Sequence, residues 1–229
     1  MAVKSRLVCL LLALLASYNA PAFAEKSVYD KSMESADAAY AAHRYEDALK
    51  DYEIALKELS ATPESVKAAR VMESIGQSMR YLKRDNEAEE MLKHALKIYE
   101  EKEGPNSKDC LYACLYLARL CMAQERYVEA LPLYKRVVAI AETRTDLEAD
   151  FVTHRIFGIA SCLEGMGNFD EAETYFNKGV AMSEKLPKDD LTIADYQNYA
   201  DYLDHRKKTK QAENIKARIK AIKEQMEKK

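Results

Sequence analysis

The chain has 229 residues, of which 48% are hydrophobic and 32% are charged, so it can form a packed core and intrinsic disorder is disfavoured. It contains six glycines, five prolines and no tryptophan, a composition that favours helices over β-sandwiches and barrels. The formal net charge is −3, whereas a general nucleic-acid-binding protein is usually basic. We therefore expect no nucleic-acid partner.

The first 24 residues have the three zones of a secretory signal. Lys4 and Arg6 precede a short apolar run, and Ala-Phe-Ala at 22–24 supplies a small-x-small cleavage site. The apolar run is about ten residues long, too short for a membrane span of about 20 residues. We predict a cleavable signal peptide over 1–24 and a mature, exported protein over 25–229, either periplasmic or secreted. An uncleaved anchor is the alternative.

A pair of small residues twelve positions apart recurs five times in the remaining chain. Successive pairs are offset by 40, 42, 42 and 40 residues: Ala36/Ala48, Gly76/Ala88, Ala118/Ala130, Ala160/Ala172 and Ala200/Ala212. Four residues after the second small residue stands a large side chain (Tyr52, Leu92, Tyr134, Phe176), with Lys216 as a departure in the last copy. This spacing predicts antiparallel helix pairs that approach closely at the small residues.

One such helix pair cannot bury its apolar face alone, so the copies should stack on their neighbours. We predict one all-α domain over 25–229, a right-handed α-solenoid of about five helix-turn-helix repeats. Turn residues such as Gly104-Pro105 and Pro187 separate the copies. The approximate repeat boundaries are 29–62, 69–104, 111–145, 153–187 and 193–229.

The segments 117–134 and 165–172 carry a family resemblance most clearly. Their pattern resembles tetratricopeptide repeats, and the 42-residue period resembles the longer kinesin-light-chain type. The resemblance implies a superhelix whose concave face binds a protein or peptide, with no catalysis and no cofactor. It does not match the carboxylate-clamp pattern, which has Asn at position 9 of adjacent repeats, where this chain has Asp37, Gln77, Arg119, Ser161 and Asp201.

In such repeats, positions 2, 5, 9 and 12 of each first helix face the concave groove. Carried over to this chain, they place arginines and aromatic residues at the centre and acidic residues at both ends. The candidate groove residues are Arg70, Arg80, Tyr112, Tyr116, Arg119 and Phe157. Because Arg and Tyr often carry binding energy at interfaces, we expect a ligand with carboxylate groups beside an apolar anchor. The alternative is that these residues form an ordinary solvated surface.

Four cysteines follow the predicted signal peptide: Cys110, Cys114, Cys121 and Cys162. Seven residues of helix span about 10.5 Å along the axis, too far for a disulfide. Neither a CxxC pair nor a nearby histidine supplies a metal-ligand set. We therefore predict buried, small hydrophobic cysteines and no metal site, while a disulfide stays open.

The C-terminal segment 206–229 has a net charge of +7. It carries an apolar stripe at helical spacing: Ala212, Ile215, Ile219, Ile222 and Met226. The preferred interpretation is a cap that packs on the preceding repeat and exposes its charged face to solvent. The alternative is peripheral association with an anionic membrane surface or an acidic second copy.

Signatures of catalysis are missing from the sequence: it has no phosphate-binding glycine loop, HExxH motif or nucleophile elbow. The histidines are dispersed at positions 43, 94, 154 and 205. We predict a non-enzymatic, exported protein-binding adaptor or scaffold that holds a peptide or protein segment in its groove. The alternative is a structural or self-assembling component, and the partner and oligomeric state stay open.

Overall fold

The computed structural model describes residues 26–148 and 150–227, so the predicted signal peptide lies outside the described residues. The described chain is helical and has no strand. Its ten α-helices are α2 (Val28–Ala41), α3 (Tyr45–Glu58), α4 (Val66–Tyr81), α5 (Asp85–Glu103), α6 (Lys108–Ala123), α7 (Tyr127–Ala141), α8 (Phe151–Gly165), α9 (Phe169–Ser183), α10 (Asp190–His205) and α11 (Thr209–Met226).

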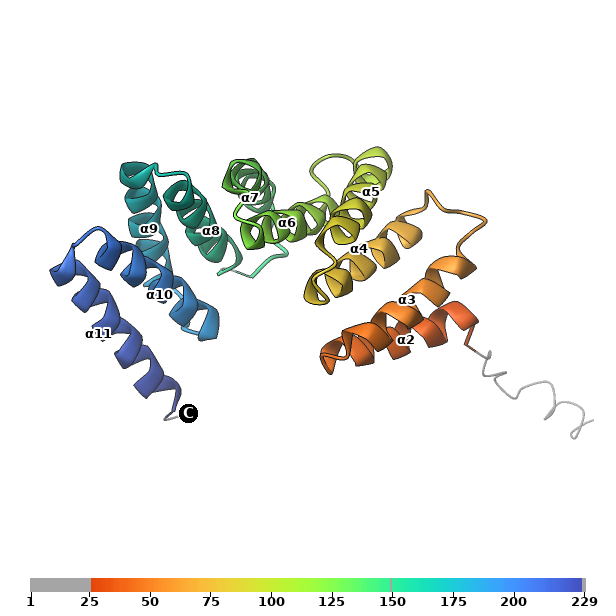
Figure 1. Cartoon of the computed structure of the whole chain (residues 1–229), viewed down its shortest axis with the longest axis horizontal. Coiled ribbons are helices and arrows are strands. Elements are labelled where there is room, and N and C mark those ends of the chain that lie inside the picture. The colour runs from red at the N-terminus through yellow and green to blue at the C-terminus, as the bar shows by residue number, and fades with distance from the viewer. Residues whose placement is uncertain (1–25, 149, 228–229) are drawn as a thin grey trace, which may run out of the picture.

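Consecutive helices form five antiparallel pairs that stack side by side into an arch (Figure 1). The pair α2–α3 lies at one end of the arch and α10–α11 at the other. The first helices α4, α6, α8 and α10 lie toward its inner side, and α5, α7 and α9 cover the outer side. The predicted all-α solenoid of about five helix-turn-helix repeats is confirmed.

Each first helix ends in the same backbone turn. A residue with positive φ stands at 43, 83, 125, 167 and 207, and only the fourth of these is glycine. The next backbone N–H reaches back to a carbonyl near the end of the helix, as in Arg126 N to Cys121 O at 2.8 Å and Lys208 N to Leu203 O at 2.8 Å. This Schellman-type closure satisfies terminal carbonyls and turns the chain sharply into the second helix.

The small residues of the repeat lie where the two helices of a pair meet. Each of the nine alanines is 0% exposed, and Gly76 is buried as well. A Cβ added to Gly76 would lie 2.8 Å from Cγ of Leu92 and 3.1 Å from the carbonyl oxygen of Ala88. The predicted close approach at the small residue is therefore confirmed, because even one methyl group would displace its neighbours.

Two of the large residues that follow a second alanine, Tyr134 and Phe176, pack against the next repeat. The ring of Tyr134 on α7 lies against Gly158 on α8, where an added Cβ would be 2.9 Å from it. The ring of Phe176 on α9 stacks on Tyr199 of α10, with ring centroids 4.8 Å apart. These contacts join neighbouring repeats into continuous hydrophobic clusters.

The four described cysteines are buried and free, so their predicted burial is confirmed. Burial raises the pKa of the Cys114 thiol to about 11 and that of Cys162 to about 12. Because the thiolate is the reactive form, these side chains act as small hydrophobic residues in the folded protein.

The apolar stripe of the C-terminal helix is turned inward. Ile215, Ile219 and Ile222 are each 6% exposed and join the core cluster that also contains Tyr199 and Leu203 of α10. This packing favours the cap interpretation over an apolar face available to a membrane. Among the described helices, none is both long and apolar enough to cross a bilayer.

Replacing Gly179 with leucine should test the close packing. A Cβ at Gly179 would lie 2.7 Å from the buried ring of Phe157, so Gly179→Leu should lower the free energy of unfolding by about 1–3 kcal/mol through overpacking. The control is Ala181→Leu on the exposed side of the same helix, which should change stability by less than about 0.5 kcal/mol. Urea denaturation measures both, and equal stability of the two variants would contradict the packing described.

Candidate functional site

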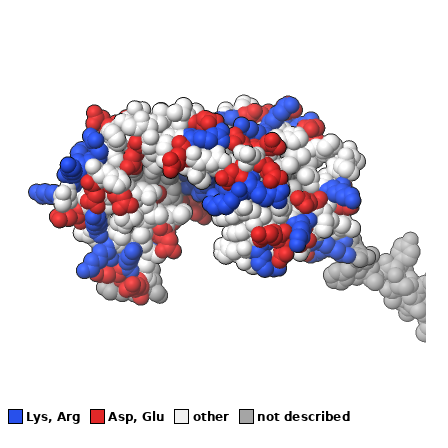
Figure 2. Space-filling model, viewed as in Figure 1, with Lys and Arg blue, Asp and Glu red and all other residues white. Residues whose placement is uncertain are grey.

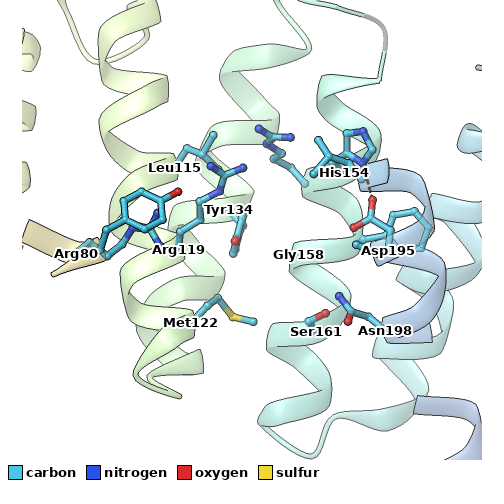
Figure 3. Close-up of a pocket in the computed structure, with 15 residues that line it drawn as sticks. Arg80, Leu115, Arg119, Met122, Tyr134, His154, Gly158, Ser161, Asp195 and Asn198 are labelled. Carbon is cyan, nitrogen blue, oxygen red and sulfur yellow. Dashed lines mark hydrogen bonds and ion pairs between the residues drawn. The ribbon is translucent and has the colours of Figure 1, made fainter. Parts of the chain in front are cut away.

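A cleft of about 430 Å³ opens on the inner side of the arch between the α4–α6 and α8–α10 helices. Figure 3 shows Arg80 and Arg119 on one side of it and His154, Asp195 and Asn198 on the other. Its apolar wall comes from Leu115, Met122 and Tyr134. In the space-filling view the hollow lies between the two arms of the arch, with basic and acidic residues interspersed over the visible face (Figure 2).

Three arginines from three successive repeats line this cleft: Arg80 on α4, Arg119 on α6 and Arg155 on α8. None of the three forms an ion pair with a described carboxylate. The Nε atoms of Arg80 and Arg155 are buried and have no hydrogen-bond partner among the described residues. The cleft therefore gathers positive charge with unsatisfied hydrogen-bond donors.

The guanidinium of Arg155 is in the least favourable environment of the three. The residue is 8% exposed, and its guanidinium carbon lies 4.0 Å from the centroid of the Phe151 ring. Burial, followed by repulsion from Arg119, lowers the pKa of Arg155 to about 10. An anion beside this group would relieve both effects, because a buried charge is disfavoured unless it is paired.

The structure brings together only some of the residues predicted from sequence. Arg80 and Arg119 line the cleft. Arg70 instead lies 2.9 Å from Asp109 and 3.9 Å from Glu103 in exposed ion pairs. Tyr112 and Tyr116 are half-buried on α6, where their rings stack with centroids 6.4 Å apart.

Phe157 differs most from its expected role as an exposed groove contact. It is 1% exposed and packs against Phe176 and Tyr196, so its ring forms part of the core beneath the floor of the cleft. The other side chains of α8 that line the cleft are His154, Arg155 and Ser161, beside Gly158. The sequence argument missed Arg155 because this residue is at none of the four repeat positions carried over from the family.

At one edge of the cleft, the starts of α8 and α10 bring together residues that could hold a metal. Nε2 of His154 lies 3.7 Å from Oδ2 of Asp150 and 3.8 Å from Oδ2 of Asp189. Its other ring nitrogen, Nδ1, lies 2.5 Å from Oδ2 of Asp195. The spacing along the sequence gave no sign of this cluster, since Asp150 and Asp189 belong to different repeats.

The chain belongs to the tetratricopeptide repeat family. One family model for the tetratricopeptide repeat matches residues 31–101 and 152–225, and a second matches residues 113–148. The fold of this family is that of a protein-interaction scaffold. A search of curated protein sequences finds no match to this chain.

Several solved structures share the fold at low sequence identity. The nearly identical TPR-like repeats assigned to a kinesin light chain of Podosopora anserina match with a TM-score of 0.73 at 18% identity, covering 87% of this chain and 96% of that one. The apo form of RapI matches with a TM-score of 0.76 at 14% identity, covering 87% of this chain and 72% of that one. MamA from Desulfovibrio magneticus RS-1, from residue 41 to its end, matches with a TM-score of 0.66 at 12% identity, covering 88% of this chain and 98% of that one.

A pH-dependent contribution to stability should come from Glu73, on α4 between Arg70 and Arg80. Burial raises its pKa from 4.5 to about 8, the charge of Asp109 adds to this shift, and Arg70 opposes it. The folded chain therefore holds a proton between about pH 5 and 8 that the unfolded chain releases, so the free energy of unfolding falls as the pH rises through this range.

The variant Glu73→Gln should remove this component and be more stable than the wild type at pH 8 by on the order of 1–3 kcal/mol. At pH 4, where the glutamate is protonated in both states, the difference should be smallest. Urea denaturation at pH 4, 6 and 8 measures it, with Glu90→Gln on the exposed face of α5 as the control. Parallel pH profiles for wild type and Glu73→Gln would contradict the assignment.

Proposed function

We propose that the protein is an exported, non-enzymatic adaptor that holds an acidic segment of another protein in its inner cleft. The observation that carries this proposal is the convergence of Arg80, Arg119 and Arg155 without a carboxylate partner among the described residues. Such an arrangement costs stability in the isolated protein. It is therefore better explained by a ligand than by the fold alone.

The chemistry of the cleft favours a carboxylate beside an apolar side chain. Arginine presents planar, paired N–H donors that fit a carboxylate with two parallel hydrogen bonds. The wall formed by Leu115 and Met122 lies next to these donors and offers apolar contact. A volume of about 430 Å³ suits one or two side chains of an extended segment more than a whole folded domain.

The family supports an adaptor more than an enzyme, because tetratricopeptide repeats are protein-interaction scaffolds. The alternative, a component that assembles end to end, is less favoured because the apolar stripe of α11 is already covered by α10. Light scattering across a dilution series separates the two. A stable monomer supports the adaptor, and growth with concentration supports assembly.

Export is the second part of the proposal and rests on the sequence of residues 1–24. The charged start, the short apolar run and the Ala-Phe-Ala triplet are those of a secretory signal. N-terminal sequencing of the protein recovered from the cell envelope or medium tests it. A start at Glu25 is the expected result, and an intact Met1 would contradict cleavage.

Acidic peptides should bind the mature protein 25–229 through the three arginines. An array of peptides that combine Asp or Glu with Leu or Phe supplies the probe, and fluorescence anisotropy measures affinity. Arg155→Gln should weaken the best peptide about 30-fold or more, since truncating one member of a buried charge pair costs about 2–5 kcal/mol. Arg119 is exposed, so Arg119→Gln should weaken it less, by about 5-fold at most. Raised salt should weaken it further.

Two controls keep this test specific. Arg70→Gln removes an arginine that is already paired outside the cleft, so it should leave the affinity nearly unchanged. A peptide with Asn and Gln in place of its acids should bind much more weakly than the parent. If the neutral peptide binds equally well, or if Arg70→Gln weakens binding as much as Arg119→Gln, the cleft assignment is wrong.

A further inference from the structure

A second site, distinct in chemistry from the arginine cleft, lies where the α7–α8 and α9–α10 connections meet. Asp150 precedes the first turn of α8, His154 follows one turn later, and Asp189 precedes α10. One ligand atom from each of the three side chains lies within 4.8 Å of the other two. The three atoms thus surround a common point beside a hollow that Asp146 and Glu148 also line.

His154 is the informative member of this group. Its side chain is 9% exposed, and its Nε2 atom is buried without a hydrogen-bond partner among the described residues. That atom faces Oδ2 of Asp150 and Oδ2 of Asp189 at distances too long for hydrogen bonds, 3.7 and 3.8 Å. A buried ring nitrogen is normally satisfied, so Nε2 of His154 is available to a ligand that also reaches the two carboxylates.

The opposite side of the imidazole is oriented as it is in metal sites. Nδ1 of His154 lies 2.5 Å from a carboxylate oxygen of Asp195 on α10. A histidine that ligates a metal usually donates its other ring N–H to a carboxylate, which fixes the tautomer and turns the free nitrogen toward the ion. Here Asp195 holds the ring so that Nε2 points at Asp150 and Asp189.

Each of the two aspartates has one carboxylate oxygen available for a metal ion. Oδ1 of Asp189 caps α10 by accepting from the backbone N–H and the hydroxyl of Thr192, while its Oδ2 faces His154. Asp150 stands at the start of α8 without making a side-chain cap bond. The local fold therefore uses neither of the two oxygens that face the imidazole.

We propose that Asp150, His154 and Asp189 bind a divalent transition metal of the Zn²⁺ type, with water completing the coordination. Zinc takes histidine nitrogen and carboxylate oxygen at about 2.0–2.2 Å, which places tetrahedral ligands about 3.3–3.5 Å apart. The separations of 3.7 and 3.8 Å from Nε2 of His154 need a closure of only a few tenths of an ångström, and all three ligand atoms lie within 4.8 Å of one another. The two carboxylates neutralise the charge of the ion, so the nearby Arg155 guanidinium does not exclude it.

The metal would tie the fourth repeat to the fifth. Asp150 and His154 belong to the start of α8, and Asp189 belongs to the start of α10, so one ion joins the two inner helices beside the arginine cleft. Because an ion bound only to the folded state stabilises it, the metal-loaded protein should unfold at a higher temperature than the metal-free protein.

The direct test uses tag-free protein 25–229 from which a chelator has removed bound metal. Calorimetry measures its titration with Zn²⁺, and the visible absorption of the ion measures its titration with Co²⁺. We expect one ion per chain, a rise in melting temperature with Zn²⁺, and a Co²⁺ spectrum of low coordination number. His154→Gln and Asp150→Asn should each weaken Zn²⁺ binding about 100-fold or more. Asp195→Asn, which removes the orienting partner, should weaken it about 10- to 100-fold.

The control variant is His205→Gln, which removes an exposed histidine 3.8 Å from Glu164 and should leave Zn²⁺ affinity unchanged. Asp189→Asn retains an oxygen to cap α10, so it tests the third ligand with the helix start intact. If His154→Gln does not fold, Asp150→Asn tests the metal site instead, because the side chain of Asp150 makes no hydrogen bond that caps α8. The proposal is overturned if wild type does not bind Zn²⁺, or if Asp150→Asn and Asp189→Asn bind it as tightly as wild type does.

Discussion

The arch depends on the contact between the two helices of each pair, which cross at two small residues. At Gly76 the neighbouring Leu92 and the backbone of α5 already occupy the space that a methyl group would need. Nine alanines make the equivalent contacts in the five pairs and are fully buried. Because two helices can pack this closely only at small side chains, the twelve-residue spacing fixes how each pair is folded. The aromatic and leucine residues between pairs then fix how the pairs stack.

This stacking decides which residues can act together. Residues of successive first helices come together although they stand about 40 residues apart, as Arg80 and Arg119 do on one side of the cleft (Figure 3). Arg155 completes the group from the next repeat. The inner helices therefore concentrate charge that no single repeat contains. The outer helices carry ordinary surface ion pairs, such as Arg84 with Glu87 and Lys93 with Glu89, which contribute little to stability.

Much of the fold could be predicted from the sequence because the small residues repeat at a fixed spacing and the two helices of a pair approach this closely only at alanine or glycine. The turns were harder: only Gly167 among the five positive-φ positions is a glycine, and the lysines, the glutamate and the histidine at the others carry no turn signal. The site was predicted in part. Arg80 and Arg119 follow from the repeat register, whereas Arg155 is at none of the positions carried over from the family and the ring of Phe157 is almost fully buried.

The histidine and aspartate cluster could not be predicted from spacing at all, because Asp150 and Asp189 stand just before α8 and α10, and their approach to His154 depends on how α8 packs on α10. The central claim concerns the arginines. A crystal structure of residues 25–229 with the tightest-binding acidic peptide tests it most directly. The account predicts a peptide carboxylate within hydrogen-bond distance of Nε of Arg155 and of the Arg119 guanidinium. A peptide bound elsewhere on the arch, with Arg155 still unpaired, would contradict it.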